Sequence, residues 1–432
     1  MSDRFTDING LLHYGYFVDW PYEPPKLPFS QATLEAARDE RSTLAALDES
    51  ALCDHGIRLW KQVCRRLLDS RSGPFVVPLS AGLDSRAILA GMADQGAPNL
   101  QTVTFGVPGS FDYEIAPDVA RQAATPHERI DLRTIAVETG RIDGIVQEPG
   151  RSSFLLDMYF NRAISDRYGP DCTYLSGYVG DVLAGKNLRD SQSVDWEQAR
   201  SRFAHKNRHS RTATLTHPDA QTTALLPEHP YVSADLMAFD EQLDYAVRQE
   251  CLMRPIVMRP DYDSIAPMLD EEWVIFMLAL SRDQRQGRRL FVQLFQRGFP
   301  ALFSLPTTAN GGLPLTASAR AVQTHQRRLK RRRRLLSKLS RLMPSITVPL
   351  GNRSWQYIDF KQGLNKRADL TALFDRGMQR IDRANWAPWI DAQGLLREHR
   401  DGVADHGKAL SVLLNLDIVT RAGALNLPPV EN

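Results

Sequence analysis

The sequence predicts an α/β protein with a parallel sheet, helices on both faces of that sheet, and a helical C-terminal part. Three observations predict this fold. Short apolar runs alternate with helical stretches between residues 70 and 175, as in a doubly wound sheet. Two of the apolar runs end in loops of small and polar residues. After residue 200, apolar residues recur mostly at helical spacing.

The expected elements follow one another in a regular order. An amphipathic helix over 49–68 precedes Phe75-Val76-Val77-Pro78-Leu79, a run that is short and apolar enough for a buried strand. The pattern then predicts helix 85–93, strand 101–105, helix 114–123, strand 128–131, helix 153–166 and strand 172–175. Further on, we expect helices over 234–252, 270–280, 288–296, 326–342 and 407–416.

The composition is typical of an intracellular enzyme. The chain has 432 residues, of which 43% are hydrophobic and four are cysteines. The cysteines form no CxxC pair, which argues against a disulfide framework and against a zinc site. The N-terminus has no signal-peptide pattern, and the apolar run 273–280 is too short to span a membrane. We therefore expect a cytoplasmic protein without a transmembrane segment.

The net charge of +2 conceals a polarised distribution. No Asp or Glu occurs between Asp283 and Asp359, whereas Arg and Lys are dense from Arg327 to Arg341. Such a run is most often a solvated helix or loop. Two other interpretations are docking to an anionic partner and closure over an active site to neutralise phosphates. Because no aromatic residues interleave the charges, we expect an anionic partner rather than nucleic acid.

The loop Ser80-Ala81-Gly82-Leu83-Asp84-Ser85 follows the first expected strand and precedes a helix. Small residues there let backbone N–H groups approach an anion, and the helix N-terminus adds the positive end of its dipole. Ser80 and Ser85 can donate to phosphate oxygens. Asp84 tolerates a phosphate only with a cation between them, and Mg²⁺ suits that role. For this loop alone, an ordinary turn capped by Asp84 or Ser85 is an equal alternative.

A second loop, Ser176-Gly177-Tyr178-Val179-Gly180-Asp181, follows the strand over 172–175. Ligands of open parallel sheets bind outside the carboxyl ends of the strands. Asp84 and Asp181 could therefore hold Mg²⁺ beside a triphosphate, and Gly177 would let the backbone lie close to the nucleotide. The alternative is again a turn aspartate, although two such loops in one sheet favour a site.

Together these motifs resemble those of asparagine synthetases, within the ATP pyrophosphatase (PP-loop) superfamily. The first loop is similar to the family's SGGxDS pyrophosphate loop, and residues 176–185 are similar to its SGxGxDxxxxG segment. Thr104-Phe105-Gly106 and the helix after it resemble the adenine-side strand and helix. Pro267-Met268-Leu269-Asp270 resembles the family's PFLD.

The resemblance implies the PP-loop fold, similar to adenine nucleotide alpha-hydrolases, and a reaction that uses ATP and Mg²⁺. The carboxylate of a small molecule or peptide attacks the α-phosphorus of ATP, and an amine then displaces AMP from the acyl-adenylate. It implies Asp84 and Asp181 as Mg²⁺ ligands. The residues that it assigns to ATP are Leu79, Ser80, Gly82, Asp84, Ser85, Val103, Thr104, Phe105 and Gly177.

The resemblance also suggests a division of the chain. Residues 1–48 form an arm that precedes the synthetase domain, and residues 49–315 form that ATP-binding domain. Residues 316–358 form the basic helical segment, and residues 359–432 form a C-terminal helical part.

Asparagine synthetases carry an N-terminal glutaminase whose nucleophile is a cysteine exposed after Met removal. This chain has Ser2 at that position, and its first loop begins at Ser80. We therefore expect the amine to come from free ammonia, from another subunit or partner protein, or from the substrate itself.

Tyr178 stands where asparagine synthetases usually have Glu. A tyrosine here is similar to β-lactam and carbapenam synthetases, in which a Tyr paired with Glu deprotonates an amine of the substrate. Tyrosine needs a carboxylate partner to act as a base near neutral pH. Glu250 and Asp244 are the candidates for that partner. An aromatic lid on the pocket is the alternative role for Tyr178.

Two further positions depart from the family pattern. The family's downstream lysine is missing, because no Lys occurs between Lys206 and Lys330. Ala81 replaces the first glycine of the pyrophosphate loop, which is tolerable if its φ is negative.

The leading hypothesis is an AMP-forming amide or lactam ligase of specialised metabolism or peptide modification. Ammonia-dependent amidation of the asparagine synthase type is a second hypothesis. A degenerate nucleotide-binding partner protein is a third, suggested by the missing lysine and by Ala81. A tRNA-modifying adenylating enzyme would explain the basic run but not the second loop.

Overall fold

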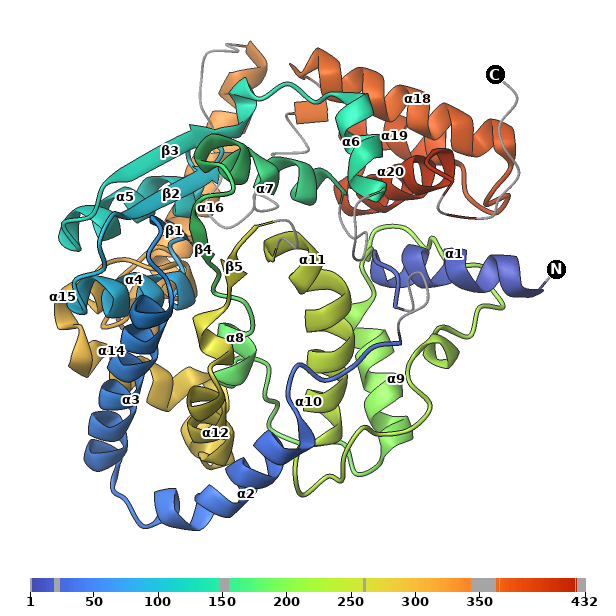
Figure 1. Ribbon diagram of the computed structural model, residues 1–432. Coiled ribbons are helices and arrows are strands. Elements are labelled where there is room, and N and C mark those ends of the chain that lie inside the picture. The colour runs from blue at the N-terminus through green and yellow to red at the C-terminus, as the bar shows by residue number, and fades with distance from the viewer. Residues whose placement is uncertain are drawn as a thin grey trace.

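A computed structural model describes residues 2–18, 24–147, 155–258, 262–342, 363–364, 366–423 and 425. Its centre is a five-stranded parallel sheet in the order β3-β2-β1-β4-β5 (Figure 1). The strands are β1 (Phe75–Pro78), β2 (Leu100–Gly106), β3 (His127–Asp131), β4 (Thr173–Leu175) and β5 (Ser264–Ile265). The predicted α/β class is confirmed. The sequence did not predict β5 because two residues carry no periodic pattern.

Helices make up most of the rest of the described chain. Their bounds are α1 (Ser2–Tyr14), α2 (Gln31–Ala45), α3 (Glu49–Ser70), α4 (Asp84–Asp94), α5 (Phe111–Gln122), α6 (Thr139–Val146), α7 (Leu155–Tyr168), α8 (Gly180–Leu183), α9 (Trp196–Asn207), α10 (Phe239–Leu243), α11 (Arg254–Val257), α12 (Glu271–Ala279), α13 (Arg282–Arg285), α14 (Arg289–Gly298), α15 (Pro300–Phe303), α16 (Ala319–Leu342), α18 (Ala368–Ala384), α19 (Ala392–Asp401) and α20 (Gly407–Arg421). None of these helices, as far as the structure describes them, is both long enough and apolar enough to cross a membrane.

Helices cover both faces of the sheet, as the sequence predicted. Successive residues of a strand point to opposite faces. Phe75 and Val77 of β1 lie in the largest apolar cluster, with side chains of α3, α4 and α5. Val76, between them, packs in another cluster with Ile164 of α7. The fully apolar β1 is therefore buried from both sides, which is why it reads as a continuous apolar run.

The strand order creates a switch point between β1 and β4. From β1 the chain passes through α4 to β2 and through α5 to β3, and it returns to β4 on the other side of β1. The connections after β1 and β4 therefore diverge, and they open a crevice at the carboxyl ends of these strands. Both loops singled out in the sequence follow these two strands.

Several helical regions differ from expectation, since α6, α9, α18 and α19 were not among the expected helices. The helix expected over 234–252 consists of α10, a π-helical segment over Asp244–Met253, and α11. Residues 2–14 form α1, which the sequence analysis did not predict. Its Ile8, Leu11 and Leu12 are buried in one apolar cluster with the C-terminal helices α18, α19 and α20 (Figure 1).

Candidate active site

A cavity of about 590 Å³ lies at the switch point, a size typical of small-molecule sites. Both loops line it, together with the ends of β1 and β2 and residues of the π-helical segment. Thr308 and Ala309, from the stretch that would carry the family's lysine, complete one wall.

The first loop surrounds the N-terminus of α4. Ser80 Oγ lies 3.1 Å from Ser85 Oγ and accepts a hydrogen bond from the Gly82 N–H at 3.1 Å. In the described part of the chain no side chain caps α4, whose N-cap residue is Leu83. The first N–H groups of this helix therefore remain available to an anion in the cavity. The capped turn considered in the sequence analysis is not what the structure shows.

Backbone hydrogen bonds of Ala81 hold the first loop in place. Its N–H donates to Asp112 Oδ1 at 2.8 Å, and its carbonyl accepts from Thr307 Oγ1 at 2.8 Å and from the Thr308 N–H at 3.0 Å. Ala81 is not among the described non-glycine residues with positive φ, so its Cβ is tolerated.

The adenine-side residues lie at the ends of β1 and β2. Leu79, Thr104 and Phe105 line the cavity, and Thr104 Oγ1 donates to the Leu79 carbonyl at 2.5 Å. Val103 packs instead in the cluster with Val76, and its carbonyl accepts a hydrogen bond from the Leu79 N–H at 2.8 Å.

Asp84 and Asp181 lie together on the cavity wall. Asp84 Oδ1 is buried and has no hydrogen-bond partner among the described residues. Burial, and then the negative charge of Asp181, raise the pKa of Asp84 well above its usual value. The nearby cations Arg288 and Lys186 act in the opposite direction, but burial and the Asp181 charge outweigh them.

Two cations already contact Asp181. Arg288 donates to Asp181 Oδ1 at 2.5 Å, and Lys186 forms an ion pair with Oδ2. Arg288 has a positive φ of 66°, which is rare for a residue with a side chain. Arg248, from the π-helical segment, also lines the cavity. None of these three cations was predicted from the sequence to lie at the site; the five-residue spacing of Asp181 and Lys186 was the signal available.

The pair of aspartates fits a magnesium ion that is held together with phosphate. Mg²⁺ usually binds one or two carboxylates and completes its shell with substrate phosphates and water. In the described part of the chain, no group of three or more His, Cys, Asp or Glu side chains gathers to hold a metal by itself. The unpartnered Oδ1 of Asp84 is the atom that such an ion would satisfy.

The glycines of the second loop allow Asp84 to approach. A Cβ on Gly180 would lie 2.8 Å from Asp84 Cγ, and a Cβ on Gly177 would lie 3.0 Å from Asp84 Cβ. Between them, Val179 has a φ of 58°. In the pattern SGxGxDxxxxG the second glycine corresponds to Val179, so this chain departs from the pattern at that position. Val179 therefore adopts the left-handed backbone conformation that favours glycine, although its own side chain is β-branched.

Tyr178 is buried on the cavity wall and pairs with Glu250. Its hydroxyl donates to Glu250 Oε1 at 2.7 Å, and Arg254 holds the same carboxylate with an Nη1–Oε2 distance of 3.0 Å. Burial, and then the Glu250 charge, raise the pKa of Tyr178 well above its usual value. Glu250 lies in the π-helical segment, a form of helix that is frequent at functional sites.

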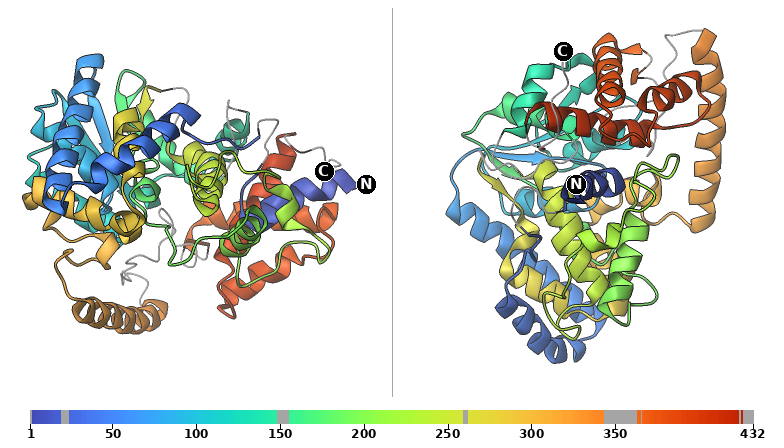
Figure 2. Two further views of the ribbon diagram at one scale, coloured as in Figure 1. Left: turned by 90° about the horizontal axis from the view of Figure 1, so that it is seen from below. Right: turned by 90° about the vertical axis from the view of Figure 1, so that its right-hand side faces the viewer.

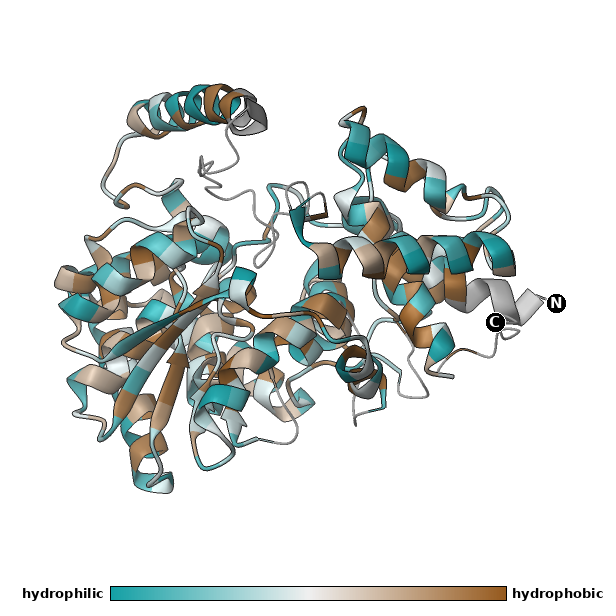
Figure 3. Ribbon diagram, turned by 90° about the horizontal axis from the view of Figure 1, so that it is seen from above, coloured by the Kyte–Doolittle hydropathy of each residue, from teal (hydrophilic) through white to brown (hydrophobic). Residues whose placement is uncertain are grey.

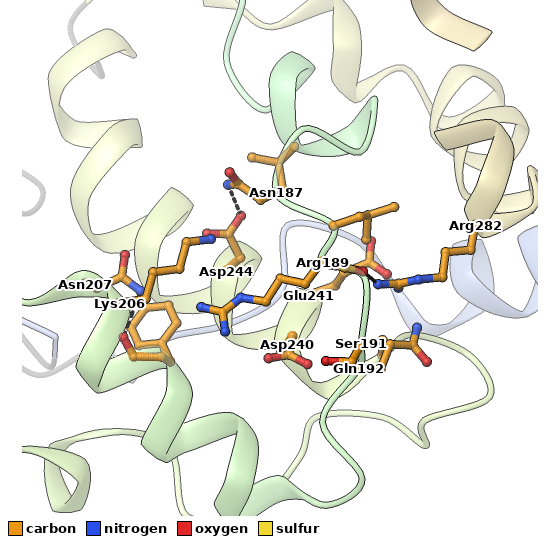
Figure 4. Close-up of a pocket in the computed structure, with 14 residues that line it drawn as sticks. Asn187, Arg189, Ser191, Gln192, Lys206, Asn207, Asp240, Glu241, Asp244 and Arg282 are labelled. Atoms are coloured by element: carbon orange, nitrogen blue, oxygen red, sulfur yellow. Dashed lines mark hydrogen bonds between the residues drawn. The ribbon is translucent and has the colours of Figure 1, made fainter. Parts of the chain in front are cut away.

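Asp244, the other candidate partner, does not reach Tyr178 in this way. Its Oδ2 accepts from Asn187 Nδ2 at 2.8 Å, and it lines a separate cavity of about 40 Å³ (Figure 4). Lys206 and Arg189 lie beside it there. Of the two carboxylates considered, the structure brings only Glu250 to Tyr178.

Asp270 of the segment that resembles PFLD lies outside the residues that line the cavity. Its side chain caps α12 by accepting from the Trp273 N–H at 3.3 Å, and it pairs with Arg66 at 2.7 Å. It therefore supports the scaffold.

The fold defines an α/β protein whose cavity lies at the switch point of a parallel sheet. The family model for asparagine synthase matches residues 58–346, which is well over half of the chain, so the chain belongs to the asparagine synthase family. This family places it among ATP-dependent carbon–nitrogen ligases and amidotransferases in general. None of the curated proteins compared with the chain matches it.

Proposed function

We propose that the protein is an AMP-forming amide or lactam ligase that activates the carboxylate of a small molecule or peptide. We place this reaction in the cytoplasm, in specialised metabolism or peptide modification. The observation that carries the proposal is the hydrogen bond of 2.7 Å to Glu250 from Tyr178, which lines the cavity that Asp84 and Asp181 share.

In this proposal the first loop binds the phosphates of ATP. Ser80, Ser85 and the open N-terminus of α4 donate hydrogen bonds to the phosphate oxygens. Asp84 and Asp181 would hold Mg²⁺, which would supply positive charge to offset the carboxylates and the phosphates. The phosphate-binding side of the cavity then lies next to the residues that receive the amine.

Arg288 is our candidate to replace the missing lysine as the cation that stabilises negative charge during the reaction. Its side chain is only 14% exposed, and it reaches the cavity from a left-handed turn at its own position. A guanidinium there can offset the negative charge that develops on the departing pyrophosphate. Lys186, on the same aspartate, is half exposed and is the weaker candidate for this role.

Tyr178 and Glu250 then serve the amine. Because the pKa of Tyr178 is raised by burial and by the Glu250 charge, a free tyrosinate is not populated near neutral pH. The hydroxyl oxygen therefore accepts the proton of the attacking amine while its own proton passes to Glu250. The bond to Glu250 already has the geometry for this transfer.

Pyrophosphate release and amide formation, measured separately over a panel of carboxylates and amines, test the proposal. For Tyr178→Phe we expect amide formation to fall about 10²- to 10⁴-fold while carboxylate-dependent exchange of pyrophosphate into ATP persists. Tyr168→Phe is the matched control, since it removes a Tyr–Glu hydrogen bond of 3.1 Å outside the cavity.

Each outcome points to one hypothesis. Unchanged amide formation by Tyr178→Phe would overturn the relay. Amide formation that requires added ammonia would favour amidation of the asparagine synthase type. Absence of both ATP binding and pyrophosphate exchange would favour a degenerate nucleotide-binding partner protein.

A further inference from the structure

The helix α16 stands apart from the rest of the described chain. In both views of Figure 2 it projects as a single helix beside the body, and Figure 3 shows the same arrangement from above. None of its described side chains is buried. A helix of 24 residues normally owes its stability to an apolar face packed against neighbours, whereas here Val322, Leu329 and Leu336 are only half-buried.

Basic side chains lie on several faces of the helix, with leucines between them. Arg327, Arg331 and Arg334 recur at helical spacing along one face, and no acidic residue occurs in the helix. Beside them, Leu335 and Leu339 are one turn apart and are 64% and 41% exposed. Few large hydrophobic residues of the described chain are as exposed as these two leucines.

The N-terminal part of α16 contacts a turn next to the candidate active site. Gln326 packs on the turn at Gly311, where a Cβ would lie 2.9 Å from its Nε2 atom. That turn follows Ala309, which lines the cavity. The N-terminal part of α16 is thus connected to the wall of the candidate site.

We propose that α16 docks on an anionic lipid surface. Phosphate headgroups match the arginine face, and the adjoining acyl region accepts the leucines, as for helices that lie in a membrane interface. Nucleic acid would satisfy the arginines but offers no apolar surface for Leu335 and Leu339. The helix is about 36 Å long, and a planar surface can engage it over that whole length.

Co-sedimentation of the full chain with lipid vesicles tests this inference. We expect binding to phosphatidylcholine vesicles that contain phosphatidylglycerol and none to pure phosphatidylcholine. At about fivefold per basic side chain, Arg331→Gln/Arg334→Gln weakens binding about 25-fold. Leu335→Gln/Leu339→Gln should weaken vesicle binding about 10-fold because apolar burial is lost. Glutamine is a good helix former, so the helix itself should persist.

The control for the leucines is Val194→Gln/Val403→Gln, which removes valines that are 81% and 74% exposed outside α16. This variant binds vesicles like the unchanged chain if the inference is right. No binding to anionic vesicles would overturn it. Tighter binding to RNA, with arginine dependence but no leucine dependence, would also overturn it. Equal thermal unfolding of all variants shows that the fold is intact.

Discussion

Replacing Gly180 by alanine tests the close approach of the second loop to Asp84. The new Cβ would lie 2.8 Å, 2.9 Å and 3.0 Å from Cγ, Oδ1 and Cβ of Asp84. Carbon atoms in contact prefer about 3.5–4.0 Å, so Asp84 has to retreat by about 0.5–1 Å. Overpacking of this kind costs about 1–3 kcal/mol. Separately, a carboxylate displaced by this distance should weaken Mg²⁺-dependent ATP binding about 10- to 100-fold, because a misplacement of about 1 Å at a site has effects of this order.

Titration calorimetry with MgATP, together with denaturant unfolding, measures both effects. The matched control is Gly144→Ala in α6, where nothing lies within 4 Å of an added Cβ. That variant should keep its ATP affinity and gain about 0.5–1 kcal/mol of stability, because glycine is unfavourable inside a helix. Wild-type ATP affinity in Gly180→Ala would refute the reasoning, because Asp84 could then not be the residue that holds the ion.

Three other predictions concern strain, buried charge and acid. In unfolding experiments, Val179→Gly should be more stable than Val179→Ala by about 0.5–1 kcal/mol, because φ is 58° there; at the right-handed Val182 the order should reverse, and equal ranks at both sites would contradict the strain. Asp84→Asn should abolish MgATP binding yet stabilise the ATP-free protein by about 1–3 kcal/mol at pH 8, since burial and Asp181 disfavour the ionised carboxylate; a loss of ATP-free stability would contradict this. Burial lowers the pKa of His127 to about 4, so the native state favours the neutral imidazole. Its contribution to the free energy of unfolding is therefore present above pH 6.5 and is lost as the pH falls towards 4. Between pH 7 and pH 4.5 the free energy of unfolding of the unchanged chain should then fall by about 1–2 kcal/mol more than that of His127→Gln. Identical pH profiles of stability would contradict the lowered pKa of His127.

The parts of the fold that depend on local pattern were predictable. β1 is buried on both faces and β4 follows a clear helix, so both strands and the loops after them could be located from apolar runs and small residues. Asp84 and Asp181 could be brought together because neighbouring parallel strands end at one edge of a sheet. The partner of Tyr178 could only be narrowed to two carboxylates on one helix.

The remainder depends on tertiary structure. Because Asp244–Met253 is wound as a π-helix, Glu250 contacts Tyr178 whereas Asp244 contacts Asn187. No residue pattern in that segment predicts the π-helical winding. Arg288 is 107 residues from Asp181, so no local pattern could join them. α1 is stabilised by packing against the C-terminal helices rather than by its own sequence.

The most direct test of the account follows the oxygen of the activated carboxylate. A carboxylate substrate that supports turnover is labelled with ¹⁸O in its carboxyl group, and the phosphorus-containing products are analysed by mass spectrometry. Attack on the α-phosphorus of ATP predicts one ¹⁸O atom in AMP and none in pyrophosphate. Formation of ADP with ¹⁸O in inorganic phosphate would contradict the proposed AMP-forming chemistry.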